Sequence, residues 1–304
     1  MFDIIIIGAG PAGLTAAIYA RRASKKVLVL EANTYGGQIL NANDIENYPV
    51  EPHISGFDFS NRLYNQVIDL KADVKFEKVI DIENSDDIKK VITKNNVYEA
   101  KTVIIATGSS VRKLGLENEE KLIGKGVSYC ATCDGAFFRG RSVAVQGGGN
   151  TAIEDALYLS DIASKVYLIH RRDGFRADEL VLNKLKQKRN VEFILNSSVT
   201  KLNAKDNLES IEITNQNGEK KVLDVSALFI AIGRIPENNN FTKFVDVDNT
   251  GYFLVDESCK TKTDGIFVAG DNRKKELRQL VTATSDGAVA AMAAIKFING
   301  KIKR

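Results

Sequence analysis

Two glycine-rich loops constrain the fold of this chain more than any other feature. Each loop follows a run of apolar residues and precedes a stretch with helical periodicity, which places backbone N–H groups at the start of a helix. The first loop is Gly8-Ala9-Gly10-Pro11-Ala12-Gly13, and the second is Gly147-Gly148-Gly149-Asn150-Thr151-Ala152. Such units are typical of dinucleotide-binding α/β folds. The sequence therefore predicts two nucleotide sites on one chain.

The first loop has glycine at the three positions where a dinucleotide-binding turn requires it. Residues 4–7 form a β-branched apolar run, as expected for a parallel strand that is buried on both faces. Gly8 permits the tight turn, and Gly10 permits close approach of a pyrophosphate. Gly13 permits packing of a helix expected at 14–24 against the strand.

The strand expected at 26–30 ends in a carboxylate, Glu31. A carboxylate at this point can accept hydrogen bonds from both ribose hydroxyls and would repel a 2′-phosphate. Two distant apolar strands, within 102–108 and 263–271, end in Thr-Gly and Gly-Asp and support a flavin dinucleotide at the first loop. The alternative is a tight glycine turn in another kind of α/β protein.

The second loop satisfies the variant pattern with Gly147, Gly149 and Ala152, where alanine still allows a helix at 151–162 to approach the sheet. The strand expected at 165–169 then ends in His170-Arg171-Arg172 instead of an acid. Guanidinium groups pair with phosphate, so this strand end favours NADPH over NADH. The alternatives are a solvated basic turn for the arginines and a packing role for His170.

Cys130-Ala131-Thr132-Cys133 precedes the second loop. In a Cys-x-x-Cys pair one thiol commonly has a lowered pKa, and the thiolate is the form that attacks disulfides. A zinc site would need two more ligands, and the rest of the chain offers only Cys259, His53 and His170 without ligand spacing. We therefore expect a redox dithiol and no metal, with Cys259 an ordinary thiol.

Composition excludes several other classes. Hydrophobic residues make up 44% of the chain and charged residues 27%, which is typical of a globular protein. The net charge of +3 is small and the basic residues are dispersed, so nucleic acid is not expected as a partner. The apolar run at the N-terminus is too short for a signal peptide or a membrane span. We expect a cytoplasmic protein with no membrane partner.

In the order and spacing of these motifs the chain resembles the two-dinucleotide-binding flavoprotein disulfide reductases, and specifically the small bacterial-type thioredoxin reductases. The resemblance implies an α/β fold with two Rossmann-like dinucleotide-binding domains, FAD at the first loop and NADPH at the second. Besides the first loop and Glu31, it implies that the following residues line FAD, with Asp271 on the ribityl chain: Gly36, Gly37, Gln38, Asn47, Ala106, Thr107, Gly108, Gly270, Asp271, Arg278 and Gln279.

Around the second loop, the family motif H-R-R-x-x-x-R-A is complete here from His170 to Ala177. The resemblance implies that Arg171, Arg172 and Arg176 bind the 2′-phosphate, with His170, Gly147, Gly149, Asn150 and Thr151 in the same nucleotide site. It also implies that Asp134, which follows Cys133, is the acid of the reaction. An N-terminal helix carboxylate without a catalytic role is the alternative for Asp134.

Because the flavin segments lie at both ends of the chain, the middle is expected to be an inserted domain. We predict an FAD domain at 1–112 and 245–304 and an NADPH domain with the dithiol at 113–244. The polar stretches near Val111–Lys113 and Pro236–Asn240 are the expected hinges. The two domains are expected to be variants of one unit.

The activity that the resemblance implies is NADPH-dependent reduction of thioredoxin by a homodimer. Electrons would pass from NADPH to FAD, then to Cys130–Cys133, then to the thioredoxin disulfide, with rotation of the inserted domain between the half-reactions. Two alternatives remain open. One is a reductase of a glutaredoxin-like or peroxidase-linked protein disulfide, and the other is a non-catalytic redox sensor that binds both dinucleotides.

Overall fold

The computed structural model describes residues 1–42, 44–85 and 87–302, and the chain divides into two compact units. Unit 1 comprises Met1–Ser110 and Ile235–Arg304, and unit 2 comprises Val111–Arg234. The second boundary therefore lies at 234/235 and not at the predicted 244/245. Phe241, Phe244 and Val245 are buried in the core of unit 1, so the chain has already returned to this unit before the predicted boundary.

The sheet of unit 1 is parallel on one side and antiparallel on the other. Its hydrogen-bonded order is β3-β2-β1-β6-β5-β4, and β17 also pairs with β6 in parallel. The predicted strand at 4–7 is confirmed at the centre of this sheet, where Ile4–Ile7 are buried. The strands are β1 (Phe2–Ile7), β2 (Val27–Glu31), β3 (Asp73–Phe76), β4 (Val79–Asn84), β5 (Lys89–Thr93), β6 (Val97–Ile105) and β17 (Ile266–Val268).

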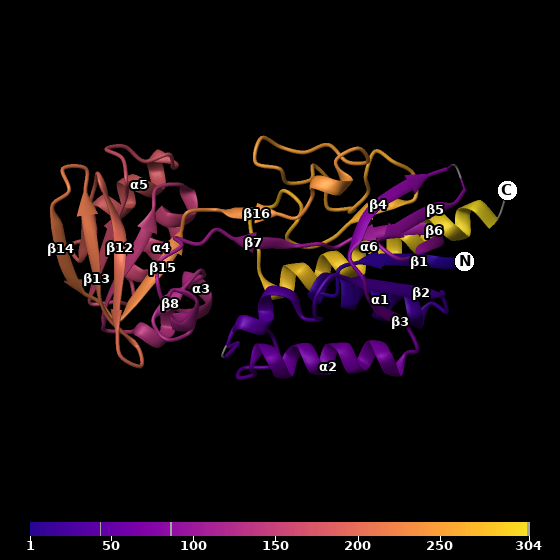
Figure 1. The fold of residues 1–304 in the computed structure, drawn as a ribbon, viewed down its shortest axis with the longest axis horizontal. Helices are drawn as coiled ribbons and strands as arrows, with labels where there is room; N and C mark the ends of the chain where they lie inside the picture. Colours follow the sequence, from indigo (N-terminus) through magenta and orange to yellow (C-terminus); the bar gives the residue numbers. More distant parts are fainter. Residues whose placement is uncertain (43, 86, 303–304) are drawn as a thin grey trace. The chain divides into compact units, whose positions relative to one another are not determined.

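One face of this sheet is covered by three helices, α1 (Pro11–Arg22), α2 (Gly56–Asp69) and α6 (Leu280–Ile302). Figure 1 shows α6 alongside α1, and α6 also packs on β6 and β17. A Cβ at Gly287 of α6 would overlap the carbonyl oxygen of Ala12, so glycine is required where the two helices cross. Residues 280–300 are long and apolar enough for a membrane span, but α6 buries Ala290, Ala291 and Ala294 against unit 1 as a core helix.

Unit 2 has a parallel sheet of order β11-β10-β9-β15-β8 and a separate antiparallel sheet β12-β13-β14. Helices α4 (Asn150–Ser160) and α5 (Glu179–Lys186) pack on the parallel sheet, and α3 (Ala131–Asp134) carries the cysteine pair. The strands are β8 (Val127–Ser128), β9 (Ser142–Gly147), β10 (Lys165–Ile169), β11 (Val191–Ile194), β12 (Ser197–Ala204), β13 (Leu208–Asn215), β14 (Lys220–Asp224) and β15 (Ala227–Ala231).

The two units repeat one local design. In each, the strand before the glycine loop pairs in parallel with the strand after the helix and with a strand from later in the unit. A Cβ at Gly8 would overlap the carbonyl oxygen of Ala106, and a Cβ at Gly147 would overlap that of Ala231. The same close approach therefore fixes glycine at the same place in both units, as expected for variants of one Rossmann-like unit.

The chain crosses between the units twice, and the two crossings pair as strands β7 (Ser109–Val111) and β16 (Arg234–Pro236). Both crossings fall within or next to the predicted hinge stretches.

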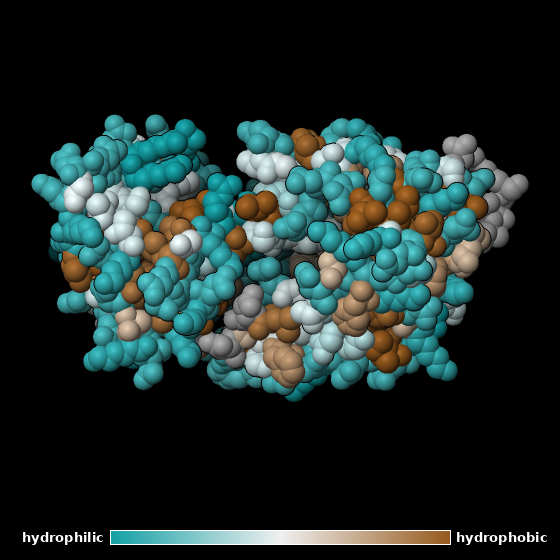
Figure 2. Space-filling model, in the orientation of Figure 1, coloured by the Kyte–Doolittle hydropathy of each residue, from teal (hydrophilic) through white to brown (hydrophobic). Residues whose placement is uncertain are grey.

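The short 3₁₀ helices are η1 (Gly37–Asn41), η2 (Glu120–Leu122), η3 (Gly135–Phe138) and η4 (Asn239–Phe241). Figure 2 shows that the visible surface of each unit is mostly hydrophilic, with small groups of hydrophobic residues between the hydrophilic ones.

Candidate functional site

The first glycine loop lies against the end of β2. The backbone N–H of Ala9 donates to Glu31 Oε2 at 2.7 Å, and Gly8 N donates to the carbonyl of Leu30 at 2.8 Å. The other carboxylate oxygen of Glu31 accepts from Asn33 N at 2.9 Å. The structure thus places Glu31 beside the loop, as predicted from its position at the strand end.

The glycines of the first loop differ in what surrounds them. A Cβ at Gly13 would overlap the carbonyl oxygen of Gly8, which confirms its role in packing helix α1 against the strand. A Cβ at Gly10 would meet nothing within 4 Å, so this glycine borders open space at the start of α1. Gly37 adjoins this space, because a Cβ there would lie 3.3 Å from Gly10 Cα. Gly36 N donates to the carbonyl of Ala9 at 2.8 Å.

Two segments from distant parts of the chain converge on the same loop. Gly270, at φ +90°, packs so closely on Ala12 that a Cβ would lie 2.9 Å from the alanine methyl. Asn272 Nδ2 donates to Thr107 Oγ1 and to the carbonyl of Ile105, both at 3.1 Å. The predicted segments around Thr107 and Gly270 therefore meet, and Asn272, which sequence reasoning missed, joins them.

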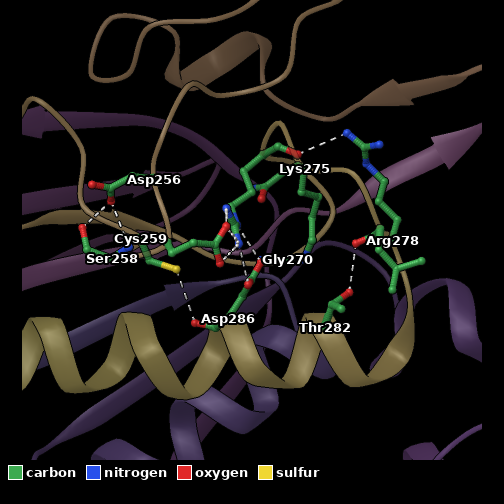
Figure 3. A network of polar contacts seen from close by, with 12 residues as sticks. Asp256, Ser258, Cys259, Gly270, Lys275, Arg278, Thr282 and Asp286 are labelled. Carbon is green, nitrogen blue, oxygen red and sulfur yellow. Dashed lines mark hydrogen bonds and ion pairs between the residues drawn. The ribbon is translucent and has the colours of Figure 1, made fainter. Parts of the chain in front are cut away.

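A buried ionic network supports the Gly270 turn (Figure 3). Asp286 of α6 accepts from Gly270 N at 3.0 Å and from Lys275 Nζ at 2.9 Å, and it forms two hydrogen bonds with Arg273. Burial opposes ionisation of Asp286, but the hydrogen bonds from Arg273 and Lys275 outweigh it and lower the pKa of this carboxyl. None of these three charged residues was predicted, since nothing in the local sequence shows that they are buried together.

The remaining predicted flavin residues lie at the surface of unit 1. Asn47 Nδ2 donates to Gln279 Oε1 at 3.2 Å, so two predicted residues from opposite ends of the chain are in contact. Arg278 donates to the carbonyl of Arg273, and its guanidinium lies 4.1 Å from the centre of the Tyr252 ring. Gln38 is exposed in η1, and Asp271 is half-buried after Gly270.

The second glycine loop lies directly under His170. A Cβ at Gly148 would overlap the imidazole, and Arg176 N donates to the carbonyl of Gly148 at 2.8 Å. Asn150 Oδ1 accepts from Asp178 N at 2.9 Å, which ties the start of α4 to the same returning segment. The segment 170–178 is therefore fixed over the loop. Gly149 is the N-cap residue of α4, and no side chain caps the first N–H groups of this helix. Thr151 is exposed in its first turn.

The three predicted phosphate ligands, Arg171, Arg172 and Arg176, are all exposed, whereas His170 is buried and stacks on Phe175. Burial lowers the pKa of His170, and the positive charges of the three arginines lower it further. The three arginines therefore act on His170 through their charges, and burial together with these charges disfavours the protonated form of this packing residue.

The cysteines Cys130 and Cys133 form a disulfide at α3. Asp134 follows them, and its Oδ2 accepts a hydrogen bond of 2.6 Å from Ser128 Oγ. Burial raises the pKa of Asp134, although the Ser128 hydrogen bond lowers it. A raised pKa favours the protonated carboxyl, which is the form that can donate a proton to a thiolate of the adjacent cysteine pair. Ser128 was missed because a serine two residues before a cysteine has no recognisable pattern.

A second missed residue, Glu119, ties this region to the linker. Its carboxylate accepts from the backbone N–H groups of residues 114, 115 and 116 at 2.7–3.1 Å and from Tyr129 Oη at 2.7 Å. Tyr129 directly precedes Cys130, and burial with the Glu119 contact raises its pKa. Glu119 therefore holds the chain that enters unit 2 beside the residue that leads into the disulfide.

Two further groups bear on the predictions. Cys259 is buried, and burial raises its pKa to about 12, so it is an inert thiol as expected.

His53 lies near two carboxylates, because its ligand atom and those of Asp44 and Glu46 lie within 4.8 Å of one another. His53 Nδ1 already contacts Asp44 Oδ2 at 3.0 Å and the side chain is exposed, so the group carries no metal assignment.

The residues at both loops fit a bound dinucleotide. Gly10 borders open space and Gly149 has only the carbonyl of Arg176 at 4.0 Å, so each loop has room that a side chain would fill. Both helices that follow, α1 and α4, begin without a side-chain cap, which leaves their first N–H groups for a phosphate. Glu31 beside the first loop suits a ribose, and the arginines beside the second suit a 2′-phosphate.

This combination of two dinucleotide loops and a disulfide defines a class of oxidoreductase, and the chain belongs to the pyridine nucleotide-disulphide oxidoreductase family, whose model matches residues 2–287. It is 39% identical over 300 residues to a thioredoxin reductase of Listeria monocytogenes, covering 98% of this chain and 94% of the relative. The crystal structure of thioredoxin reductase from Streptococcus pyogenes is 40% identical, with a TM-score of 0.94 and 99% of each chain covered. Thioredoxin reductase from Giardia duodenalis is 36% identical, with a TM-score of 0.93 over 98% of this chain and 99% of that one.

These similarities confirm the predicted relationship to thioredoxin reductases and the predicted fold class. The chain is an FAD-dependent oxidoreductase of a family that uses FAD and a pyridine nucleotide. The disulfide at Cys130–Cys133 is consistent with the redox-active disulfide of such an enzyme.

Proposed function

We propose that the chain is an NADPH-dependent thioredoxin reductase that acts as a cytoplasmic homodimer. The observation that carries the proposal is the disulfide Cys130–Cys133 with a buried carboxyl, Asp134, next to it, in a chain with full-length similarity to thioredoxin reductases. When bound, FAD accepts a hydride from NADPH and supplies two electrons for disulfide reduction.

The residues of unit 1 are proposed to bind and orient FAD. The open space at Gly10 admits the pyrophosphate, the uncapped N–H groups of α1 face it, and Glu31 accepts from the ribose. Gly270, Asp271 and Asn272 lie at the same edge of the sheet, which suits contacts with the ribityl chain. The Asn47–Gln279 contact supports their assignment to one flavin-lining group.

The residues of unit 2 are proposed to bind NADPH and to carry the dithiol. Arg171, Arg172 and Arg176 supply the positive charge that a 2′-phosphate requires, which supports NADPH as the donor. In the proposed cycle Asp134 holds the proton that a departing thiolate takes. The paired crossings β7 and β16 are the proposed hinges for rotation of unit 2 between half-reactions.

The test is an anaerobic titration in two stages. The purified protein is expected to be yellow and to lose its flavin absorbance on addition of NADPH, much faster than with NADH. Addition of oxidised thioredoxin should then restore the absorbance. Restoration by a glutaredoxin-like or peroxidase-linked protein disulfide, and not by thioredoxin, would replace the substrate assignment. Flavin that NADPH does not reduce would indicate a non-catalytic binding protein.

A further inference from the structure

Ser128 has the geometry of a residue that controls a neighbouring acid. The residue is 3% exposed, and its backbone is fixed in β8, where it pairs with Phe229 of β15. The hydroxyl donates to Asp134 Oδ2 at 2.6 Å, has the carbonyl oxygen of Cys130 as a longer alternative acceptor at 3.3 Å, and accepts from Cys130 N at 3.1 Å. One buried hydroxyl thus bonds both the carboxyl and the backbone of the first cysteine.

The two oxygens of Asp134 are not equivalent. Oδ2 lies within hydrogen-bond distance of the Ser128 hydroxyl, whereas Oδ1 has no hydrogen-bond partner in the described part of the chain. When Asp134 is ionised, the Ser128 hydroxyl donates to Oδ2. When Asp134 is neutral, a proton on Oδ2 can be donated to Ser128 Oγ while the hydroxyl turns to the carbonyl of Cys130, so Ser128 can hold the carboxyl in both protonation states.

We propose that Ser128 is a positioning residue for the reaction, which holds the Asp134 carboxyl through Oδ2 and stabilises the carboxylate that remains after the proton has left. This inference rests on the proposed disulfide reductase function. It goes beyond that function by naming the group that orients and strengthens the acid.

The proton and electron count of the substrate half-reaction shows where Ser128 acts. A thiolate of the Cys130–Cys133 dithiol attacks the substrate disulfide, breaks its S–S bond and releases one substrate thiolate, which takes the proton from Asp134. The second enzyme thiol loses its proton to the Asp134 carboxylate and attacks the enzyme sulfur of the mixed disulfide. The S–S bond between enzyme and substrate breaks, and the second substrate thiolate leaves and takes this proton from Asp134. The enzyme is oxidised to its disulfide by two electrons, and the substrate gains two electrons and two protons.

In the disulfide form, no charged side chain of the described residues contributes to the pKa shift of Asp134. In the reduced form the thiols of Cys130 and Cys133 titrate beside this carboxyl, and their effect on its pKa is present in the parent and in the Ser128 variants alike. The pKa of this carboxyl responds to burial, which raises it, and to the Ser128 hydrogen bond, which lowers it. The ionisable groups on the elements around α3 do not contribute to this shift: Tyr129, Arg139, Glu154, Asp155, Tyr158 and Asp161. Loss of the Ser128 hydroxyl should therefore raise the pKa of Asp134 and keep it protonated to higher pH.

The experiment measures oxidation of the reduced holoenzyme dithiol by hydroxyethyl disulfide and by thioredoxin between pH 5 and pH 9. In Ser128→Ala the falling limb of the pH–rate profile should move to higher pH by roughly half a pH unit to one pH unit. The rate at pH 7 should fall about tenfold, because Asp134 is then a weaker and less well oriented acid. Ser128→Thr, which keeps the hydroxyl, should restore both. Ser160→Ala removes another buried serine, whose hydroxyl donates to the carbonyl of Leu157, and should leave the profile unchanged.

A disulfide whose leaving thiolate needs no proton separates positioning from structure. With the aromatic disulfide DTNB, Ser128→Ala should match the parent, since its leaving thiol is strongly acidic. Two results would overturn the proposal. One is an equal loss of rate in Ser128→Ala with DTNB and with hydroxyethyl disulfide. The other is a pH–rate profile of Ser128→Ala whose falling limb superimposes on that of the parent. Hydroxyethyl disulfide keeps this test valid if thioredoxin is not the substrate, and Ser128→Gly replaces the alanine variant if that one does not fold.

Discussion

Arg273 donates two hydrogen bonds to Asp286, from Nε to Oδ2 and from Nη2 to Oδ1, each 2.8 Å long. The two side chains are 3% and 7% exposed, and Lys275 contacts the same carboxylate. Two buried cations thus depend on one buried acid beneath the Gly270 turn (Figure 3). Cys259 Sγ lies 3.7 Å from the backbone oxygen of Asp286, so the network also fixes the segment before β17.

Removal of the shared acid should strongly destabilise unit 1. Asp286→Ala leaves the buried Lys275 without this anion and Arg273 with only the exposed Glu257, and we expect a loss of about 3–5 kcal/mol in the free energy of unfolding. Glu257→Ala is the matched control, because Glu257 also contacts Arg273 but its side chain is 90% exposed, and its loss should cost less than about 1 kcal/mol. Urea unfolding measures both, and equal effects would contradict the assignment of Asp286 as the hub.

The ion pair between Arg273 and Asp286 predicts that the stability of the fold depends on pH. The folded protein holds the pKa of Asp286 below its ordinary value, so its contribution to stability is complete above the unfolded pKa, near 4. It is lost as the pH falls through the lower folded pKa. Thermal unfolding of the parent should therefore show a midpoint that falls below about pH 4, and Asp286→Ala should show a smaller fall over the same range.

Two glycines of the first loop should separate folding from cofactor binding. Gly10 has an extended backbone with open space at its Cβ position, so Gly10→Ala should fold normally but bind FAD at least about tenfold more weakly, a loss of roughly 1.4 kcal/mol. Gly13→Ala forces a methyl group onto the carbonyl of Gly8 and should cost about 3 kcal/mol of stability. Flavin content per folded chain distinguishes the two, and full flavin in Gly10→Ala would contradict the pyrophosphate assignment.

The arginine cluster should set the choice of donor. Arg171→Glu with Arg172→Glu should raise the KM for NADPH roughly 10- to 100-fold or more, since each charge-assisted contact with phosphate contributes about 1.5–3 kcal/mol. The rate with NADH and the flavin content should not fall. Arg189→Glu changes another exposed arginine of unit 2 and serves as the control. Parallel losses with NADH and NADPH would contradict a 2′-phosphate site.

The three cysteines should react differently. Cys130→Ser with Cys133→Ser should abolish thioredoxin reduction yet leave flavin reduction by NADPH nearly unchanged, because the dithiol acts after that step. Cys259→Ser should leave both half-reactions unchanged. In the reduced native protein, iodoacetamide should modify Cys130 or Cys133 but not Cys259, whose pKa is about 12 and whose side chain is buried. Thioredoxin reduction by the double variant at the parent rate would contradict the relay.

Short-range patterns in the sequence were enough to predict much of this fold. The strand at 4–7, the glycine loops and the carboxylate at Glu31 follow from short-range patterns, because each element needs particular residue types at fixed spacing. The structure also brings together Asn47 with Gln279 and the segment of Thr107 with that of Gly270. Their proximity was implied by resemblance and could not follow from spacing alone.

What could not be predicted depends on tertiary packing. A single hydroxyl such as that of Ser128, and charged residues such as Arg273 and Asp286, have no sequence pattern that shows burial or partners. The domain boundary near 245 was wrong because the prediction did not recognise that Phe241 and Phe244 pack in the core of unit 1. The point at which the chain re-enters unit 1 can be located only when the residues that form the core of that unit are known.

The paired crossings β7 and β16 have a consequence for synthesis on the ribosome. All of unit 2 lies between them, so this unit is complete once Arg234 has been added, whereas unit 1 still lacks β17 and α6. Domains generally fold as they emerge, and closing a loop with fixed, adjacent ends adds little entropic cost. We therefore expect the inserted unit to be the first to mature in the nascent chain, and to bring the ends of the interrupted unit together before its last helix is translated.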